Sequence, residues 1–286
     1  MLIIGEALRR AIQRADAAGI EDARLECELL MAHALASDRT HVLAGLTEPI
    51  SDARLAAFNE LARRRIENRE PLAYITGRCE FYGLSLICAA GALIPRPETE
   101  MLVDLALEQI AQRSGHARIV DVGTGTGAVA CAIAALAPDT RVLAVDASTE
   151  ALAIAAQNVA SLGLGDRVAL RRGDLLADTG EFDVIVANLP YVADADWADL
   201  ALEIRLHEPK QALVPGPRGT EAIERLLRLA PAHLAACGVL AAEMGAMQGG
   251  ELVALAVACF PQATVSVMKD FAGLDRVLVV RANGED

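Results

Sequence analysis

The first 70 residues repeat apolar side chains three or four positions apart, which is the spacing of an amphipathic helix. Three stretches carry this pattern: Leu8 and Ile12, then Leu25, Leu29, Ala32 and Leu35, then Leu55, Phe58 and Leu61. Ser51 and Asp52 stand where a helix cap is favoured before the third stretch. No glycine-rich loop or catalytic cluster occurs here. The pattern predicts a small helical domain over residues 1–70, with a role in recognising or positioning a substrate.

Residues 71–93 have a different character. Tyr74-Ile75-Thr76 and Glu80-Phe81-Tyr82-Gly83-Leu84 combine β-type residues with glycine, which predicts a β-hairpin linking two domains. The next segment, Ile94-Pro95-Arg96-Pro97, has two prolines one residue apart, and these do not fit inside a helix. We therefore expect a stiff loop, followed by a helix that begins near Thr99.

From residue 117 onward, strand-like and helix-like segments alternate. The short apolar segments 119–122, 141–146, 168–171, 184–187 and 238–243 are compatible with strands, and alanine- and leucine-rich helical patterns lie between several of them. Residues 264–268 and 276–280 resemble a closing hairpin. This alternation predicts an α/β domain over residues 94–286, in which helices cover a mostly parallel sheet.

Composition narrows the class of protein. A chain of 286 residues is long enough for about two domains, and 53% hydrophobic with 23% charged residues is typical of a globular protein. The formal net charge of −13 disfavours nucleic acid as the main partner, because duplex-binding proteins present a concentrated basic surface. The basic clusters at residues 63–65 and 171–172 are interpreted as solvated helix faces or strand ends.

The cysteines and histidines indicate neither disulfides nor a metal. The six cysteines form no CxxC pair and the five histidines are dispersed, so we expect reduced, mostly buried thiols, a cytoplasmic location and no metal site. The first residues have the reverse charge order of a secretory signal. The longest apolar run, residues 128–137, is too short to span a bilayer, so no membrane association is expected.

A glycine-rich turn, residues 121–127 (DVGTGTG), follows the first predicted strand of the sheet. Glycines at a strand end let backbone N–H groups approach a ligand, and the spacing differs from the GxGxxG of nicotinamide enzymes. Asp146 ends the next strand, where a carboxylate accepts ribose hydroxyls, while Asp174 and Leu175 are placed for an adenine. The candidate cofactor-binding residues are Gly123, Thr124, Gly125, Thr126, Gly127, Asp146, Asp174, Leu175 and Asn188.

The tetrapeptide Asn188-Leu189-Pro190-Tyr191 follows another predicted strand, about 65 residues after the glycine turn. The carboxamide of Asn188 has a donor and an acceptor that match those of a primary amide, and the Leu189 carbonyl provides a second acceptor. Pro190 stiffens the turn, and Tyr191 offers a face for stacking. These four are the candidate catalytic residues, for methyl transfer to a nitrogen. An adenine edge presents the same donor and acceptor pair, so Asn188 alone does not separate glutamine from adenine.

Taken together, these motifs resemble the S-adenosylmethionine-dependent methyltransferases, and within them the glutamine N5-methyltransferases of peptide chain release factors. The resemblance covers nearly the whole chain. It is carried by residues 69–77 (REPLAYITG), 80–84 (EFYGL), 94–100 (IPRPETE), 121–127, 188–191, 208–209 (EP), 243–245 (EMG) and 269–276 (KDFAGLDR). The proline-rich loop and the segment ending in Tyr-Ile-Thr-Gly are more specific to this family than the glycine turn.

The resemblance implies a helical N-terminal domain, a hairpin linker and a seven-stranded methyltransferase domain. It also implies S-adenosylmethionine as cofactor and, as substrate, the glutamine of the Gly-Gly-Gln tripeptide of release factors. The family usually has Asn-Pro-Pro-Tyr, whereas this chain has Leu189 at the second position, as in ribosomal RNA adenine dimethyltransferases. The carbonyl at position 189 is retained, so the mechanism is expected to persist; loop stiffness, and hence rate, is what the change affects. Leu175 stands where the family often has an aromatic residue.

Three alternatives remain beside this interpretation. An adenine-N6 methyltransferase acting on RNA or DNA is the nearest, but a positive surface is missing and the segment 71–100 does not suit it. A nicotinamide oxidoreductase would need a hydride-transfer partner residue that the sequence does not offer. A methyltransferase-shaped binding protein without activity would be expected to have lost Asn188 or the glycines, and this chain has both.

Overall fold

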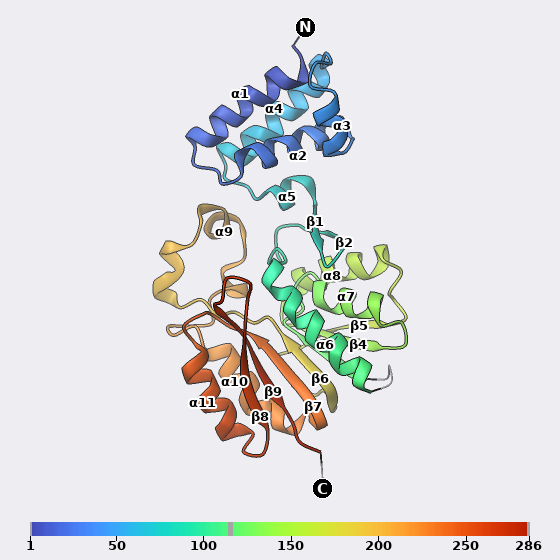
Figure 1. Ribbon diagram of the computed structural model, residues 1–286, viewed down its shortest axis with the longest axis vertical. Helices are drawn as coiled ribbons and strands as arrows, with labels where there is room; N and C mark the ends of the chain where they lie inside the picture. Colours follow the sequence, from blue (N-terminus) through green and yellow to red (C-terminus); the bar gives the residue numbers. More distant parts are fainter. Residues whose placement is uncertain (1, 114–116, 285–286) are drawn as a thin grey trace. The chain divides into compact units, whose positions relative to one another are not determined.

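The computed structural model describes residues 2–113 and 117–284. The chain divides into two compact units, which are described separately (Figure 1). The helical unit comprises Met1–Gly77 and Ala201–His207, and the sheet unit comprises Arg78–Leu200 and Glu208–Asp286. A short segment from the second half of the sequence thus belongs to the N-terminal unit, which the sequence patterns do not reveal.

The helical unit is a bundle around large apolar side chains, as the spacing predicts. Leu30, Met31 and Phe58 are completely buried in its core, and the Ser51 hydroxyl caps the fourth helix by accepting the Arg54 N–H. The elements are α1 (Ile4–Ala17), α2 (Ala23–Leu35), α3 (Arg39–Ala44), α4 (Asp52–Ile66), α5 (Leu72–Thr76) and α9 (Leu202–His207).

The expectation of β structure at residues 74–76 is wrong, because this segment is helix α5. Pro71 precedes the first helical residue with φ −57°, a value that suits a helix start, and its carbonyl accepts the N–H groups of Tyr74 and Ile75. Gly77, at φ +73°, ends the turn in the left-handed region. Pro71 at the start and Gly77 at the end favour a short helix, and this outweighs the β propensity of residues 74–76.

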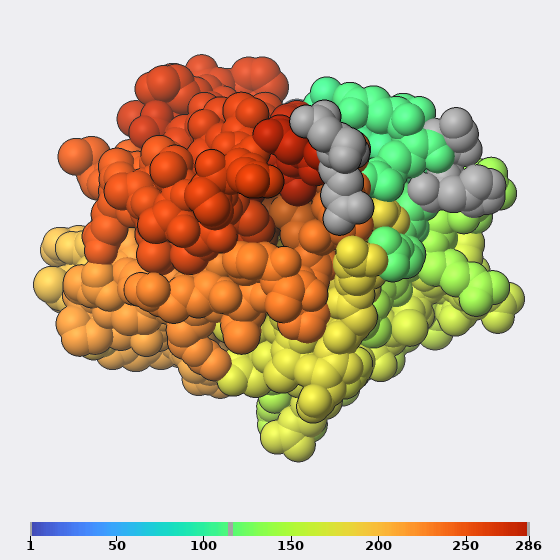
Figure 2. Space-filling model, turned by 90° about the horizontal axis from the view of Figure 1, so that it is seen from below, coloured from blue at the N-terminus to red at the C-terminus, as the bar shows by residue number. Residues whose placement is uncertain are grey.

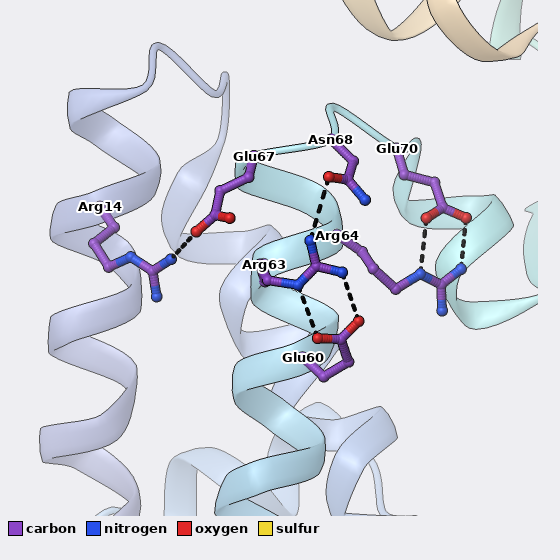
Figure 3. A network of polar contacts seen from close by, with 7 residues as sticks. All are labelled: Arg14, Glu60, Arg63, Arg64, Glu67, Asn68 and Glu70. Atoms are coloured by element: carbon purple, nitrogen blue, oxygen red, sulfur yellow. Dashed lines mark hydrogen bonds and ion pairs between the residues drawn. The ribbon is translucent and has the colours of Figure 1, made fainter.

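Two of the three consecutive arginines at the end of α4 form ion pairs at the surface (Figure 3). Arg63 donates two hydrogen bonds to Glu60, and Arg64 donates two to Glu70. Their charges are therefore matched by carboxylates rather than gathered into a basic patch. This arrangement agrees with a solvated helix face, not with a nucleic-acid surface.

For Arg65 the interpretation as a solvated residue is wrong, because it is only 6% exposed. Its guanidinium donates to both carboxylate oxygens of Glu26 and, at 2.8 Å, to Glu203 of α9. Arg69 also pairs with Glu203. A buried arginine needs such partners, since an unpaired charge away from water is costly. This pairing attaches the segment Leu202–His207 to the bundle.

The sheet unit contains seven strands in the order β5-β4-β3-β6-β7-β9-β8. All neighbours are parallel except β7/β9 and β8/β9, so the predicted mostly parallel sheet and its closing hairpin are confirmed. The strands are β3 (Arg118–Val122), β4 (Arg141–Asp146), β5 (Val168–Arg172), β6 (Phe182–Ala187), β7 (Leu234–Glu243), β8 (Thr264–Lys269) and β9 (Asp275–Arg281). A separate hairpin is formed by β1 (Arg78–Phe81) and β2 (Leu84–Ile87).

Helices cover both faces of this sheet. One face packs against α6, α7 and α8, and the other packs against α10 and α11. Figure 2 shows α10 and α11 (light to deep orange) on one side and α6 (green) on the other. The helices are α6 (Glu100–Gln112), α7 (Ala128–Leu136), α8 (Thr149–Ser161), α10 (Glu221–Leu229) and α11 (Gly249–Cys259), with 3₁₀ turns η1 (Pro97–Thr99), η2 (Asp194–Asp199), η3 (Lys210–Ala212) and η4 (Ala230–Ala232).

The alternation of side chains along the strands explains why both faces are apolar. Val184 and Val186 of β6 point into the first cluster, whereas Ile185 and Ala187 point into the second, and all four are completely buried. A strand buried on both faces reads as a continuous apolar run, which is the pattern that the sequence shows at residues 184–187.

Three further observations concern the expectations from composition. Among the described residues, no helix combines the length and apolar character needed to cross a bilayer, and no group of three or more His, Cys, Asp or Glu side chains is arranged to hold a metal. All six cysteines are free thiols, of which three are buried. The Sγ atoms of Cys79 and Cys88 lie 2.8 Å apart at the β1–β2 hairpin, a proximity that the sequence patterns do not reveal.

Asn158 of α8 connects this hairpin to the glycine turn. Its Oδ1 accepts the Ile87 N–H at 2.6 Å, and its Nδ2 donates to the carbonyls of Ile87 and Thr126. The side chain is completely buried. One buried amide therefore satisfies backbone groups of two separate segments, the β1–β2 hairpin and the glycine turn.

We expect Asn158→Ala to lower the free energy of unfolding of the sheet unit by roughly 2–4 kcal/mol, because partly buried backbone groups lose their partners. Urea denaturation followed by fluorescence or circular dichroism measures this. Gln157→Ala, a neighbouring exposed position on the same helix, is the matched control and is expected to shift stability by about 0.5 kcal/mol at most. Equal changes in the free energy of unfolding of the two variants would show that the Asn158 hydrogen bonds do not stabilise the sheet unit.

Candidate active site

The parallel pairing of β3 with β6 brings the two predicted motifs into contact. Val122 lies opposite Ala187, so the glycine turn and the tetrapeptide leave the sheet side by side. A Cβ atom added to Gly123 would lie 2.9 Å from Leu189 Cδ2 and 3.3 Å from the Asn188 carbonyl oxygen. The chain order reverses here, since β4 and β5 lie on one side of β3 and β6 on the other. Open α/β sheets bind ligands at such a switch point.

A cavity of about 450 Å³ opens at this edge of the sheet unit. Most of the predicted cofactor residues line it, together with residues of the proline-rich loop. Those predicted cofactor residues are Gly123, Thr124, Gly125, Thr126, Asp146, Asp174, Leu175 and Asn188, and the predicted catalytic residues Leu189 and Pro190 line the cavity as well. Gly127 is not part of the lining. It is the N-cap residue of α7, at φ +79°, and a Cβ atom added to it would lie 3.2 Å from Ala155 Cβ. Tyr191 is also outside the lining, with its partly buried ring against the second core cluster.

The glycine turn is held by the end of β4. Val145 O accepts the N–H groups of both Gly123 and Thr124, and Asp146 Oδ2 accepts the Gly125 N–H at 2.8 Å. Asp146 Oδ1 accepts the Ser148 N–H at 2.8 Å. A carboxylate has about four acceptor positions, so lone pairs remain on both oxygens of Asp146 for ligand hydroxyls. Asp146 therefore shapes the turn as well as facing the cavity.

A second carboxylate, Asp121, also holds the glycine turn. It is 2% exposed, and its Oδ2 accepts the Thr124 hydroxyl at 2.6 Å and the Ala130 N–H at 3.2 Å. Burial raises the pKa of Asp121 to about 6, with the nearby charge of Asp146 adding to the effect. The sequence analysis gave this residue no role. The sequence feature that could have pointed to Asp121 is its position as the single acid of an apolar strand, just before the glycine turn.

Asp174 and Leu175 lie at the expected place but differ from each other in environment. The Asp174 side chain is 64% exposed and pairs with Arg225 at 2.6 Å. Leu175 is 8% exposed and lines the cavity with φ +53°, in the left-handed region that a branched residue seldom adopts. The contact expected between Asp174 and an adenine amino group stays a prediction.

Asn188 belongs to a chain of hydrogen bonds that the sequence analysis missed. Its Nδ2 donates to Thr99 Oγ1 at 2.9 Å, and Thr99 Oγ1 donates to Glu243 Oε2 at 2.6 Å. The Tyr191 hydroxyl donates to the other oxygen of Glu243 at 3.0 Å. The sequence feature that could have pointed to this chain of hydrogen bonds is Glu243, a single acid that ends the apolar strand β7.

The proline-rich loop is fixed by Glu208, which is 6% exposed. Its Oε2 accepts the Ile94 N–H at 3.0 Å, and its Oε1 accepts from Arg96 at 2.5 Å. Pro95 and Thr99 of this loop line the cavity. The loop therefore forms a wall of the site rather than a simple connection between domains.

These residues fit a nucleoside cofactor. The volume lies in the range of roughly 300–1,000 Å³ that small-molecule pockets occupy, and the glycine backbone approaches the cavity without side chains. Asp146 stands at the carboxyl end of β4 with free acceptor positions, and Leu175 contributes an apolar surface. The charge balance also suits a cationic ligand, because the acids here outnumber the bases in the lining.

Comparison with known proteins gives two family matches. Residues 6–77 match the family described as PrmC N-terminal domain, and residues 99–248 match the one described as methyltransferase small domain. A release factor glutamine methyltransferase of Nitratidesulfovibrio vulgaris is 40% identical over 283 residues, covering 96% of this chain and 94% of its own. The enzyme of that name from Cereibacter sphaeroides is 39% identical, covering 96% and 97%.

The chain belongs to the release factor glutamine methyltransferase family. It is therefore an enzyme of the methyltransferase class, and the resemblance drawn from its motifs is confirmed. Among solved structures, the hMettl16 catalytic domain in complex with MAT2A 3'UTR hairpin 6 matches with a TM-score of 0.56 at 15% identity, covering 82% of this chain and 84% of that one. At this identity the likeness shows the methyltransferase fold alone. The predicted α/β fold with a helical N-terminal domain is confirmed.

We expect Gly123→Ala to weaken cofactor binding by about 10-fold or more, since an added Cβ at φ +75° meets Leu189 and strains the backbone. Isothermal titration with S-adenosylmethionine measures the affinity. Gly163→Ala is a matched control, because it has a similar φ of +67° but open space around it and lies after α8. If both substitutions left affinity unchanged, the close approach of turn and tetrapeptide would not matter for binding.

Proposed function

We propose that this methyltransferase transfers a methyl group from S-adenosylmethionine to the side-chain amide nitrogen of the glutamine in the Gly-Gly-Gln motif of peptide chain release factors. The observation that carries the proposal is Asn188 in the cavity lining, with its backbone carbonyl beside the glycine turn and its carboxamide held by Thr99. The names of relatives that align over nearly the whole chain support it. The protein would act in the cytoplasm, where release factors work, without a direct nucleic-acid or membrane partner.

The chemical task is to make an amide nitrogen nucleophilic. Its lone pair is delocalised into the carbonyl, so the nitrogen must be turned and held for attack. Asn188 Oδ1 and the Leu189 carbonyl are the acceptors proposed for its two N–H groups. Two acceptors that draw both hydrogens out of the amide plane localise the lone pair toward the methyl donor. Positioning of this kind contributes up to roughly 7–11 kcal/mol at its limit.

No strong base is required for this reaction. The substrate nitrogen becomes acidic only as it becomes cationic, and its proton then leaves through an acceptor already bonded to it. The neutral side chain of Asn188 is suited to this role because it accepts a hydrogen bond at any physiological pH. Bound S-adenosylmethionine supplies an electrophilic methyl group on a sulfonium.

The residues proposed to hold the cofactor are the glycine turn, Asp146, Asp174 and Leu175. The backbone N–H groups of the turn are partly used by β4, so the turn contributes shape and close approach more than free donors. Asp146 lines the cavity and is proposed to accept ribose hydroxyls with its remaining lone pairs. Leu175 offers an apolar surface for an adenine ring. Asp174 pairs with Arg225 through Oδ2, which leaves lone pairs on Oδ1 for an adenine amino group.

Leu189 replaces the proline that the family usually has, and its side chain has a structural task. It is 5% exposed, packs in the second core cluster and lies directly against Gly123. The backbone carbonyl that would accept the substrate N–H is present with either residue. We therefore infer that Leu189 keeps turn and tetrapeptide in register by packing, where proline would do so by ring stiffness.

The helical unit is proposed to recognise the release factor. Several of its charged side chains form ion pairs among themselves, such as Arg14 with Glu67 and Arg64 with Glu70. A bundle of this type offers a broad surface rather than a small-molecule pocket. The unit also includes the segment Leu202–His207, which follows the tetrapeptide in sequence and is held to the bundle by Arg65 and Glu203.

We expect the protein to transfer label from methyl-labelled S-adenosylmethionine to a release factor, and not to the same factor with Gly-Gly-Ala in place of Gly-Gly-Gln. Scintillation counting and peptide mass spectrometry locate the label. The control reaction contains RNA and DNA oligonucleotides rich in adenine. Label on nucleic acid, or equal label on both release factors, would favour an adenine methyltransferase or a different acceptor and would refute the proposal.

Two substitutions are expected to separate chemistry from cofactor binding. Asn188→Ala should reduce kcat by about 100-fold or more, the size seen when a positioned catalytic hydrogen-bond partner is removed, and leave cofactor affinity within about 3-fold. Asp146→Ala should weaken cofactor affinity first, by roughly 10-fold or more, because a charged acceptor and the support of Gly125 are both lost. Titration calorimetry and single-turnover kinetics provide the two measurements. Near-normal turnover in Asn188→Ala would contradict the amide-pairing mechanism.

A further inference from the structure

We propose that Thr99 and Glu243 are positioning residues that determine which end of the Asn188 carboxamide faces the substrate. This inference rests on the proposed role of Asn188 and extends it. The three residues come from separate elements: Thr99 ends η1, Asn188 follows β6, and Glu243 ends β7. Strands β6 and β7 are parallel neighbours with Ala187 opposite Ala242, so Asn188 and Glu243 leave the sheet next to each other.

The chain of hydrogen bonds is closed to solvent at its far end. Glu243 is 1% exposed and Thr99 is 4% exposed, whereas Asn188 is half-buried and lines the cavity. The bonds run from Asn188 Nδ2 to Thr99 Oγ1 at 2.9 Å and from Thr99 Oγ1 to Glu243 Oε2 at 2.6 Å. Because water does not reach Thr99 and Glu243 freely, each must satisfy its hydrogen bonds within this group.

The direction of these bonds follows from the chemistry of the carboxylate. Ionised Glu243 is an acceptor only, and its two oxygens take the hydroxyl protons of Thr99 and Tyr191. The single hydroxyl proton of Thr99 is thereby committed to Glu243, so its oxygen is left as an acceptor toward Asn188. Only the NH₂ end of Asn188 is a donor. The carboxamide is therefore held with Nδ2 toward Thr99 and Oδ1 on its other side.

This orientation matters because the two ends of a carboxamide are nearly equal in shape. Nothing in packing alone distinguishes Nδ2 from Oδ1. In the proposed reaction Oδ1 accepts an N–H of the substrate glutamine. If the carboxamide were reversed, an NH₂ group would face the NH₂ group of the substrate, which removes an acceptor and opposes binding in the reactive pose. The Glu243 carboxylate, two hydrogen bonds away, thus selects the reactive orientation of the Asn188 carboxamide.

The surroundings of Glu243 define a pH dependence. Burial raises the pKa of Glu243, opposed by the hydroxyls of Thr99 and Tyr191 and by the positive charge of Arg276 on β9, while the charge of Glu98 on η1 acts in the same direction as burial. Burial and the Glu243 charge also raise the pKa of Tyr191, which keeps its phenol a donor. As pH falls, Glu243 takes up a proton above the ordinary glutamic acid range and stops being an acceptor-only group.

The test uses substitutions that remove one feature each. Thr99→Val keeps the shape but has no hydroxyl, and it is expected to lower kcat by roughly 10- to 100-fold, with cofactor affinity and the KM for release factor within about 3-fold. Thr99→Ser restores the hydroxyl and should recover most of that loss. Thr264→Val on β8, an exposed position outside the cavity, is the matched control for the loss of a threonine hydroxyl.

Glu243→Gln tests direction rather than presence. The new side chain has an acceptor oxygen at one end and a donor NH₂ group at the other. The Thr99 hydroxyl is therefore no longer obliged to donate to position 243, and kcat is expected to fall by about 10-fold. Since the residues act in series, Thr99→Val with Glu243→Gln should be no slower than the slower single variant. The acid limb of the kcat–pH profile that belongs to Glu243 should disappear in Glu243→Gln. Substitution of a residue that serves stability alone would leave the acid limb of the pH profile unchanged and would give additive losses in the double variant.

A readout independent of methyl transfer separates this inference from the proposed function. In ¹⁵N-labelled protein the side-chain amide protons of Asn188 are assigned by their absence in Asn188→Ala. The proton donated to Thr99 should be shifted downfield of its partner, and the shift should collapse in Thr99→Val and change in Glu243→Gln. Urea denaturation confirms that each variant is folded.

The outcomes divide cleanly. Wild-type kcat in Thr99→Val, additive losses in the double variant, or unchanged Asn188 amide protons in both single variants would overturn the inference. If the amide protons respond as described but the wild-type protein does not methylate a release factor, the proposed function fails while the orientation of Asn188 by Thr99 and Glu243 stands. If the folded Thr99→Val variant loses kcat and Thr99→Ser recovers it, both are supported.

Discussion

The structure depends on the parallel pairing of β3 with β6. This pairing places a glycine turn and an Asn-Leu-Pro-Tyr turn side by side at the point where the strand order reverses. Gly123 has no side chain to separate them, and Leu189 packs into the space that results. Methyl transfer needs a donor pocket and an acceptor site in contact, so this one register relation creates both the cavity and the place where the acceptor nitrogen would enter it.

Buried acids hold the loops around that cavity. Each one accepts hydrogen bonds from hydroxyl, N–H or guanidinium groups of a different segment and so converts a flexible connection into a fixed wall. They are Asp121 under the glycine turn, Glu208 behind the proline-rich loop and Glu243 behind Asn188. A carboxylate is suited to this task because it offers several acceptor positions and no donor, which sets the direction of every bond made to it.

Two parts of the chain show where local patterns were insufficient. Residues 74–76 have β-type side chains, but Pro71 and Gly77 bound a short helix over Leu72–Thr76, so backbone geometry outweighed side-chain propensity. The arginines at 63–65 look equivalent in sequence, yet Arg65 is buried against Glu26 and Glu203 while Arg63 faces solvent. Glu203 lies 138 residues from Arg65, so no local window contains the partner that makes burial of this charge possible.

The sequence alone was enough for the strands of the sheet, the closing hairpin, the glycine turn and the tetrapeptide, because alternation, apolar runs and turn residues are local properties of the chain. The sequence was also enough to predict the family, since the motifs that resemble that family are spread over nearly the whole chain. The tertiary structure alone decided that Gly127 supports a helix rather than the cavity, that Tyr191 bonds to Glu243, and that Thr99 stands between Asn188 and that acid. These facts depend on contacts between elements far apart in sequence, and a hydrogen bond acquires a direction only when both of its partners are in place.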